Sequence, residues 1–105
     1  MSVIKLTAAN FEQEVMKSEK PVLIDFYADW CGPCQMQTPI LERVADALVN
    51  EAVIAKLNVD ESQDIAIEYG VASIPTMIIF KDGKEVDRIV GLTPEDKIIE
   101  RIKAV

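Results

Sequence analysis

The chain has 105 residues, half of them hydrophobic, a formal net charge of −7 and a pI near 4.5. This length suits one domain with a core of its own, and the apolar content excludes a disordered chain. The acidic balance argues against nucleic acid or anionic membranes, which attract clustered Lys and Arg. No apolar run approaches the ~20 residues of a membrane span. We therefore expect a single domain over residues 1–105 that binds neither nucleic acid nor membrane.

The amino-terminal segment predicts a strand followed by a helix. Val3–Leu6 forms a short edge strand, and Thr7 is the expected N-cap of a helix over residues 8–17. Ala8, Phe11 and Val15 are expected to face inward. Residues 1–6 lack the basic start, long apolar stretch and cleavage site of a signal peptide, so we expect a cytoplasmic protein.

Residues 22–28 form an apolar run that predicts a central strand buried between helix layers. Asp25 interrupts this run. Burial of a carboxylate is costly and raises its pKa, and such groups gather at functional sites. The alternative is that the strand turns Asp25 to solvent, or that Asp25 simply pairs with a lysine.

Cys31 and Cys34 are the only cysteines, and they follow this strand directly. If a helix begins at Cys31, unpaired backbone N–H groups and the helix dipole favour its thiolate over its thiol. Cys34 then lies on the same helix face, one turn further, so the two sulfurs can close a disulfide. Pro33 suits the first helical turn, and Gly32 leaves room for a docking partner.

Two other interpretations of the cysteine pair exist. A structural disulfide closed over so few residues removes little entropy from the unfolded chain. Structural zinc needs four N or S ligands, and the sequence has no histidine and no third cysteine. A metal site would therefore need two chains or carboxylate ligands, and we expect a redox pair without a metal.

The rest of the chain alternates helices and strands. We expect a helix over residues 32–49, the strand Val53–Asn58, a helix over 63–69 capped by residues 60–62, and strands over 77–80 and 86–90, then the helix Glu95–Lys103. Gly70 suits a left-handed C-cap, and Asp82-Gly83 favours a type I′ hairpin turn. The inward positions of the first and last of these helices are Leu41, Val44, Ala45, Leu48, Ile98, Ile99 and Ile102. The order β-α-β-α-β-α-β-β-α predicts a mixed α/β sheet with helices on both faces.

The stretch Trp30-Cys31-Gly32-Pro33-Cys34, after Asp25-Phe26-Tyr27-Ala28, resembles the active site of the thioredoxin family. Matching positions continue in order along nearly the whole chain: Pro39, Lys56, Asn58-Val59-Asp60, Tyr69-Gly70-Val71, Ser73-Ile74-Pro75-Thr76, Phe80-Lys81-Asp82-Gly83 and Val90-Gly91. The chain departs from the family at Gln35 and Ala72, where a basic residue is frequent. The resemblance implies the three-layer α/β/α thioredoxin fold, with the active-site strand in the centre of the sheet.

The resemblance also implies roles for individual residues. Cys31, exposed and thiolate-prone, would attack a protein disulfide, and Cys34 would resolve the mixed disulfide. Asp25 would take the proton from Cys34, with Lys56 as the buried partner of that carboxylate. Trp30, Ile74, a cis Pro75 and Gly91 would form the docking surface, where Ile74 offers backbone groups to an extended substrate.

The family resemblance further implies a protein-disulfide reductase that acts as a monomer and an electron carrier. Electrons would come from NADPH through a flavoprotein thioredoxin reductase, and the chain itself would need no bound cofactor. Its four glycines form no dinucleotide-binding signature.

Two other functions remain open from the sequence. A disulfide oxidase or isomerase would share the fold, although Gly32-Pro33 between the cysteines resembles reductants. An accessory binding subunit of another enzyme would keep its function after both cysteines were replaced by serine.

Overall fold

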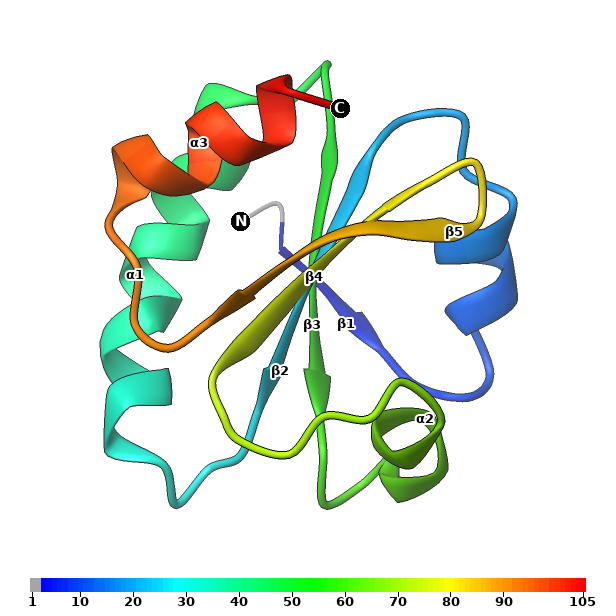
Figure 1. Ribbon diagram of the computed structural model, residues 1–105, viewed down its shortest axis with the longest axis vertical. Helices are drawn as coiled ribbons and strands as arrows, with labels where there is room; N and C mark the ends of the chain where they lie inside the picture. The colour runs from blue at the N-terminus through cyan, green and yellow to red at the C-terminus, as the bar shows by residue number, and fades with distance from the viewer. Residues whose placement is uncertain (1–2) are drawn as a thin grey trace.

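A five-stranded mixed sheet lies at the centre of the molecule (Figure 1). The computed structural model describes residues 3–105, so Met1 and Ser2, which belong to the segment tested for a signal peptide, lie outside the described residues. Within this range no helix is both long enough and apolar enough to cross a membrane. The elements in chain order are β1 (Val3–Leu6), η1 (Glu12–Met16), β2 (Val22–Tyr27), α1 (Gly32–Ala47), β3 (Val53–Asn58), α2 (Gln63–Glu68), β4 (Thr76–Lys81), β5 (Lys84–Val90) and α3 (Glu95–Lys103).

The strands are arranged in the order β1-β3-β2-β4-β5. β3 pairs in parallel with β1 and β2, whereas β4 pairs antiparallel with β2 and β5. β2 is thus the middle strand and β1 an edge strand, which confirms both expectations. Because β2 is covered on both faces, its residues 22–26 are all buried, including the charged Asp25.

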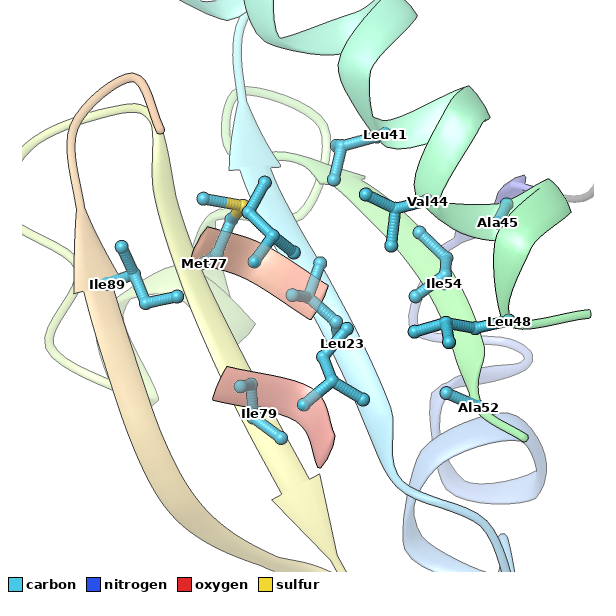
Figure 2. Close-up of a cluster of buried hydrophobic side chains, with 12 residues drawn as sticks. Leu23, Leu41, Val44, Ala45, Leu48, Ala52, Ile54, Met77, Ile79 and Ile89 are labelled. Carbon is cyan, nitrogen blue, oxygen red and sulfur yellow. The ribbon is translucent and has the colours of Figure 1, made fainter. Parts of the chain in front are cut away.

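Helices cover both faces of the sheet, which confirms the three-layer α/β/α architecture. Figure 1 shows α1 and α3 on one side of the sheet and α2 on the other. Side chains of α1 point toward Leu23 and Ile54 in Figure 2, and Ile98 and Ile102 of α3 complete this cluster. Ile99, also expected to face inward, is half-buried against it. A second cluster joins η1 and α2 to the opposite face, because strand side chains alternate between faces.

The predicted helix over residues 8–17 is wrong in its first three residues and in its type. Residues 8–10 form a turn instead, where Thr7 Oγ1 accepts from Ala9 N and Asn10 Oδ1 accepts from Thr7 N. These are the bonds that an N-cap residue and the residue three positions later make at the start of a helix, and Phe11 N donates to Thr7 O as in a helical turn. Ala8 is exposed rather than inward. The π-helix η1 follows, in which Lys17 N donates to Glu12 O.

Other boundaries differ only slightly from those predicted. α1 ends at Ala47 instead of residue 49, and α2 ends before Tyr69 with Gly70 at φ 64°, as expected for a left-handed C-cap. Ser62 makes no side-chain capping bond; Asn58 Oδ1 accepts from the backbone of residues 60 and 61 instead. Asp82 and Gly83 both have positive φ, which confirms the type I′ hairpin turn.

Candidate active site at the start of helix α1

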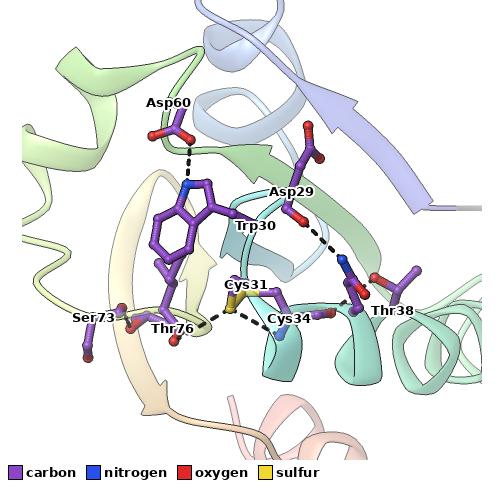
Figure 3. The surroundings of a disulfide bond; sticks show 10 residues. Asp29, Trp30, Cys31, Cys34, Thr38, Asp60, Ser73 and Thr76 are labelled. Carbon is purple, nitrogen blue, oxygen red and sulfur yellow. Dashed lines mark hydrogen bonds between the residues drawn. A yellow bond between two sulfur atoms is a disulfide. The ribbon is translucent and has the colours of Figure 1, made fainter.

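Cys31 and Cys34 form a disulfide at the point where the chain leaves β2 and enters α1 (Figure 3). Cys31 is the N-cap residue of α1, and Pro33 lies in the first turn, where its missing N–H group costs no hydrogen bond. One helical turn separates the two cysteines, and their Cα atoms are 5.2 Å apart. The sequence-based placement of the pair is therefore confirmed.

The sulfur of Cys31 lies at the positive end of a helix. Cys34 N donates to Cys31 Sγ at 3.2 Å, and the α1 dipole points its positive end toward this atom. Both interactions favour negative charge on sulfur, so the reduced protein should carry a thiolate more readily at Cys31 than a free cysteine does.

Burial at the disulfide differs from the expected exposure of Cys31. Cys31 is only 5% exposed and Cys34 only 2%. Both pack with Ala28, and Ile74 and Tyr27 lie against the same cluster. The expectation of an exposed Cys31 is wrong for the disulfide form, because Ile74 comes from a distant loop whose position the sequence does not reveal.

Asp25 lies on the sheet face that α1 covers, and it is 2% exposed. The alternative in which β2 turns Asp25 to solvent is therefore wrong. Burial raises the pKa of Asp25 to about 7, and the positive charge of Lys56 offsets part of this rise. Within residues 3–105, Asp25 Oδ1 has no hydrogen-bond partner. A carboxyl of this kind exchanges its proton near neutral pH, as a general base must.

Lys56 is the neighbour of Asp25 across the β2–β3 ladder. Its Nζ lies over the ring of Tyr27, 5.6 Å from the ring centroid, a cation–π geometry. The interaction of Lys56 with Asp25 is thus a through-space attraction between charges rather than a hydrogen bond at Oδ1.

Two neighbouring spaces are lined by these groups. A surface hollow of about 300 Å³ is lined by Cys34, Thr38 and Lys56, among others. An inner cavity of about 10 Å³ is lined by Asp25 and shares Thr38 and Lys56 with the hollow. This volume is close to that occupied by one water molecule.

Of the residues expected to form the docking surface, Trp30 directly precedes Cys31, and Ile74 contacts Cys31 from a separate loop. Ile74 O lies 4.0 Å from Cys31 Sγ, and the Ile74–Pro75 peptide bond is cis, as the resemblance implies. Gly91 N donates to Pro75 O at 2.8 Å, and Trp30 is 72% exposed. Pro75 itself is buried, so it holds Ile74 and Gly91 together rather than presenting its ring to solvent.

Both glycines near the site face open space. A Cβ atom added at Gly32 or Gly91 would meet no other atom within 4 Å. Gly91 has φ 96°, a conformation that other residues rarely adopt. The chain therefore leaves free room at Gly32, between the two cysteines, and at Gly91, where a partner's backbone can approach.

Two contacts near this site were not predicted from the sequence. Trp30 Nε1 donates to Asp60 Oδ2 at 2.9 Å, as Figure 3 shows, although Asp60 was expected only at a helix cap. Gln37 is completely buried and bonds to Thr93. The first contact spans two loops and leaves no pattern. The second contact has a sequence signal, since Gln37 is a polar residue on the inward stripe of α1.

A disulfide closed over one turn at the start of a helix, together with a buried carboxyl of raised pKa on the strand that leads into it, indicates a thiol–disulfide oxidoreductase. Comparison with known proteins agrees. The Thioredoxin family model matches residues 2–104. A thioredoxin of Chlorobaculum thiosulfatiphilum is 52% identical over 96 residues, which cover 91% of this chain and 89% of that protein. A thioredoxin of Porphyra purpurea is 44% identical over 98 residues (93% and 92%), and thioredoxin 1 of Synechococcus elongatus is 47% identical over 90 residues (86% and 84%).

The chain therefore belongs to the thioredoxin family. It is a thiol–disulfide oxidoreductase with protein-disulfide reductase activity, and its substrates are proteins that contain disulfides.

Proposed function

We propose that this protein reduces disulfides with Cys31 as the nucleophile and Cys34 as the resolving cysteine. The Cys31 thiolate attacks one sulfur of the partner's disulfide; the S–S bond of the partner breaks, and its other sulfur leaves as a thiolate that takes up a proton. The observation that carries this assignment is the hydrogen bond from Cys34 N to Cys31 Sγ, because it stabilises charge on Cys31 alone.

The second step completes the transfer of two electrons from the dithiol to the partner. Cys34 loses its proton to Asp25, and its thiolate attacks Cys31 Sγ, which releases the partner's second thiolate and forms the Cys31–Cys34 disulfide. A pKa of Asp25 near 7 suits this proton transfer at neutral pH. The inner cavity at Asp25 has room for one water, which would lie between Asp25 and the hollow at Cys34. Lys56, on the neighbouring strand, would lower the pKa of the Asp25 carboxyl.

The docking surface would comprise Trp30, Ile74 and Gly91, with Gly32 and Pro33 in the loop beside Cys31. An extended substrate segment would pair with the backbone of Ile74, whose carbonyl oxygen is 4.0 Å from Cys31 Sγ. Pro75 supports this surface from below, through its bond to Gly91 N.

The cycle needs an outside source of two electrons. We infer that a thioredoxin reductase supplies them from NADPH and that this chain acts as an electron carrier without a bound cofactor. We also infer that the single domain over residues 1–105 works as a monomer in the cytoplasm, where reduced thiols are maintained.

Capture of the mixed disulfide tests the roles of the two cysteines. Reduced Cys34→Ser protein, mixed with two peptides joined by a disulfide, should accumulate a covalent adduct whose added mass equals one of the two peptides, the other being released as a thiol. The matched Cys31→Ser variant should form at least tenfold less adduct, because its remaining thiol, Cys34, lacks the charge-stabilising contact that Cys31 Sγ receives. Equal capture by both variants would contradict the assignment.

The reduction potential tests the direction of the reaction. Equilibration of Cys31–Cys34 with dithiothreitol should place it near the reference value for thioredoxin itself, about −270 mV, whereas about −180 mV would indicate an isomerase. Function that survives replacement of both cysteines by serine would instead indicate an accessory binding subunit.

A further inference from the structure

Gln37 is a fully buried polar side chain with no role in the chemistry above. It lies on α1, one turn beyond Cys34, on the stripe that otherwise carries Leu41 and Val44. An apolar residue could fill this place without any need for hydrogen bonds, whereas a buried amide that lacks partners destabilises the fold. The partners of Gln37 therefore indicate what the amide contributes.

Both ends of the Gln37 amide bond to the backbone of one residue, Thr93. Gln37 Nε2 donates to Thr93 O, and Thr93 N donates to Gln37 Oε1, each at 2.9 Å. We call this pair of bonds the Gln37 clamp. Thr93 belongs to the segment between β5 and α3, which passes beside α1 in Figure 1. The two-point contact fixes the position of this segment along α1 more strictly than apolar packing would.

The Gln37 clamp continues to the docking surface through hydrogen bonds. Thr93 Oγ1 donates to Gly91 O at 2.9 Å, and Gly91 N donates to Pro75 O at 2.8 Å. Pro75 follows Ile74, whose carbonyl oxygen faces Cys31 Sγ. Gln37 thus ties the helix that carries both cysteines to the two loops that border them. The same segment presents Leu92, an exposed apolar side chain, between the anchored residues 91 and 93.

We propose that Gln37 is a positioning residue that holds the 91–93 segment in the arrangement needed to bind extended polypeptide disulfides. The side chain touches neither sulfur nor substrate; it acts through Thr93 and Gly91. The consequence is selectivity: polypeptide disulfides that use the segment depend on Gln37, and small disulfides that reach Cys31 alone do not. This inference rests on the proposed docking role of Gly91 and Ile74.

The test compares two disulfides in single turnovers of pre-reduced protein, so no reductase is needed. One is an extended peptide with an intramolecular disulfide, and the other is hydroxyethyl disulfide. Gln37→Met keeps the length of the side chain but removes the Gln37 clamp. We expect Gln37→Met to raise the half-saturating peptide concentration about tenfold, because one to two buried hydrogen bonds are lost. The limiting rate with the peptide and the rate with hydroxyethyl disulfide should each change less than about twofold.

Val44→Ala is the matched control, because Val44 is equally buried on α1 but contacts the sheet core instead of the segment. It should lower the unfolding free energy and leave the half-saturating peptide concentration unchanged. Amide hydrogen exchange gives a second readout: the Thr93 amide should be protected in the native protein and exchange faster in Gln37→Met, while the Ile54 amide in β3 keeps its protection.

Three outcomes would overturn the proposal. If Gln37→Met lowers the reduction rate of both disulfides equally, Gln37 acts on the cysteines themselves. If the half-saturating peptide concentration does not change, Gln37 is only a packing residue. Free exchange of the Thr93 amide in the native protein would show that the Gln37 clamp does not persist in solution. Gly91→Val distinguishes failure of the Gln37 proposal from failure of the proposed docking surface. If Gly91→Val also binds the peptide normally, the docking surface itself is wrong.

Discussion

Asp25 and Lys56 face each other across the β2–β3 ladder, yet Lys56 Nζ lies over the ring of Tyr27 and Asp25 Oδ1 is left without a hydrogen-bond partner among the described residues. The carboxyl therefore has the desolvation cost of burial with only partial compensation by a nearby charge, which is why its pKa rises to about 7. Conditions that favour the protonated Asp25 carboxyl stabilise the fold, whereas ionised Asp25 is the form that accepts a proton from Cys34.

Asp25→Ala should become more stable than the native protein as pH rises. Because the folded pKa lies above the unfolded value, the native protein loses about 4 kcal/mol of unfolding free energy between about pH 4 and about pH 7. The variant lacks this loss, so its advantage should grow across that window and level off above it. Chemical denaturation of the disulfide form at several pH values measures this difference, and resolution by Cys34 should be slower in the variant. A variant that is less stable at alkaline pH, with unchanged resolution, would contradict the role of Asp25.

Lys56→Met should move the titration of Asp25 to higher pH, because Lys56 is the charge that lowers the pKa of this carboxyl. The carboxyl ¹³C resonance of Asp25 followed against pH reports the shift directly. Lys56→Arg keeps a positive charge at the same position and serves as the control. A titration unchanged in Lys56→Met would show that Lys56 exerts no electrostatic influence on the site.

Asp60→Ala should weaken the docking of peptide disulfides about two- to fivefold, since an exposed hydrogen bond contributes about 0.5–1 kcal/mol. Asp60 Oδ2 accepts a hydrogen bond from the indole of Trp30, the exposed residue that directly precedes Cys31. The half-saturating peptide concentration and the fluorescence anisotropy of Trp30, the only tryptophan, measure the effect. Asp60→Asn retains an acceptor and should behave nearly as the native protein. Loss of docking without added mobility of Trp30 would point to another role for Asp60.

Asp87→Asn should show a pH dependence opposite to that of Asp25→Ala. Arg101 of α3 donates two hydrogen bonds of 2.6 Å to Asp87 of β5 and holds the pKa of this carboxyl below its usual range. The stabilisation is therefore present above about pH 4 and is lost as pH falls through the lowered pKa. We expect a loss of about 1 kcal/mol at neutral pH, given the partial exposure of the pair, and a smaller loss in acid. An equal loss at every pH would assign the effect to packing.

Local sequence patterns predicted nearly all the strands and helices. Apolar runs located β2 and β3, Pro33 after Cys31 located the start of α1, and Asp82-Gly83 located the hairpin turn. These features depend on neighbours in the chain, whose preferences are visible in the letters themselves. The prediction of a regular helix was wrong at residues 8–10, which form a turn although the side chains of Thr7 and Asn10 make the bonds of a helix N-cap.

The sequence by itself determined the cysteine pair, the buried strand that carries Asp25 and the expected order of the elements, because spacing and hydrophobic period encode them. Only the tertiary structure decided the surroundings of these groups. It buried Cys31 beneath Ile74, placed Lys56 over Tyr27, joined Trp30 to Asp60 and anchored Thr93 to Gln37. Each of these contacts joins residues from separate segments of the folded chain, and their distances depend on how the sheet and helices pack rather than on any local preference.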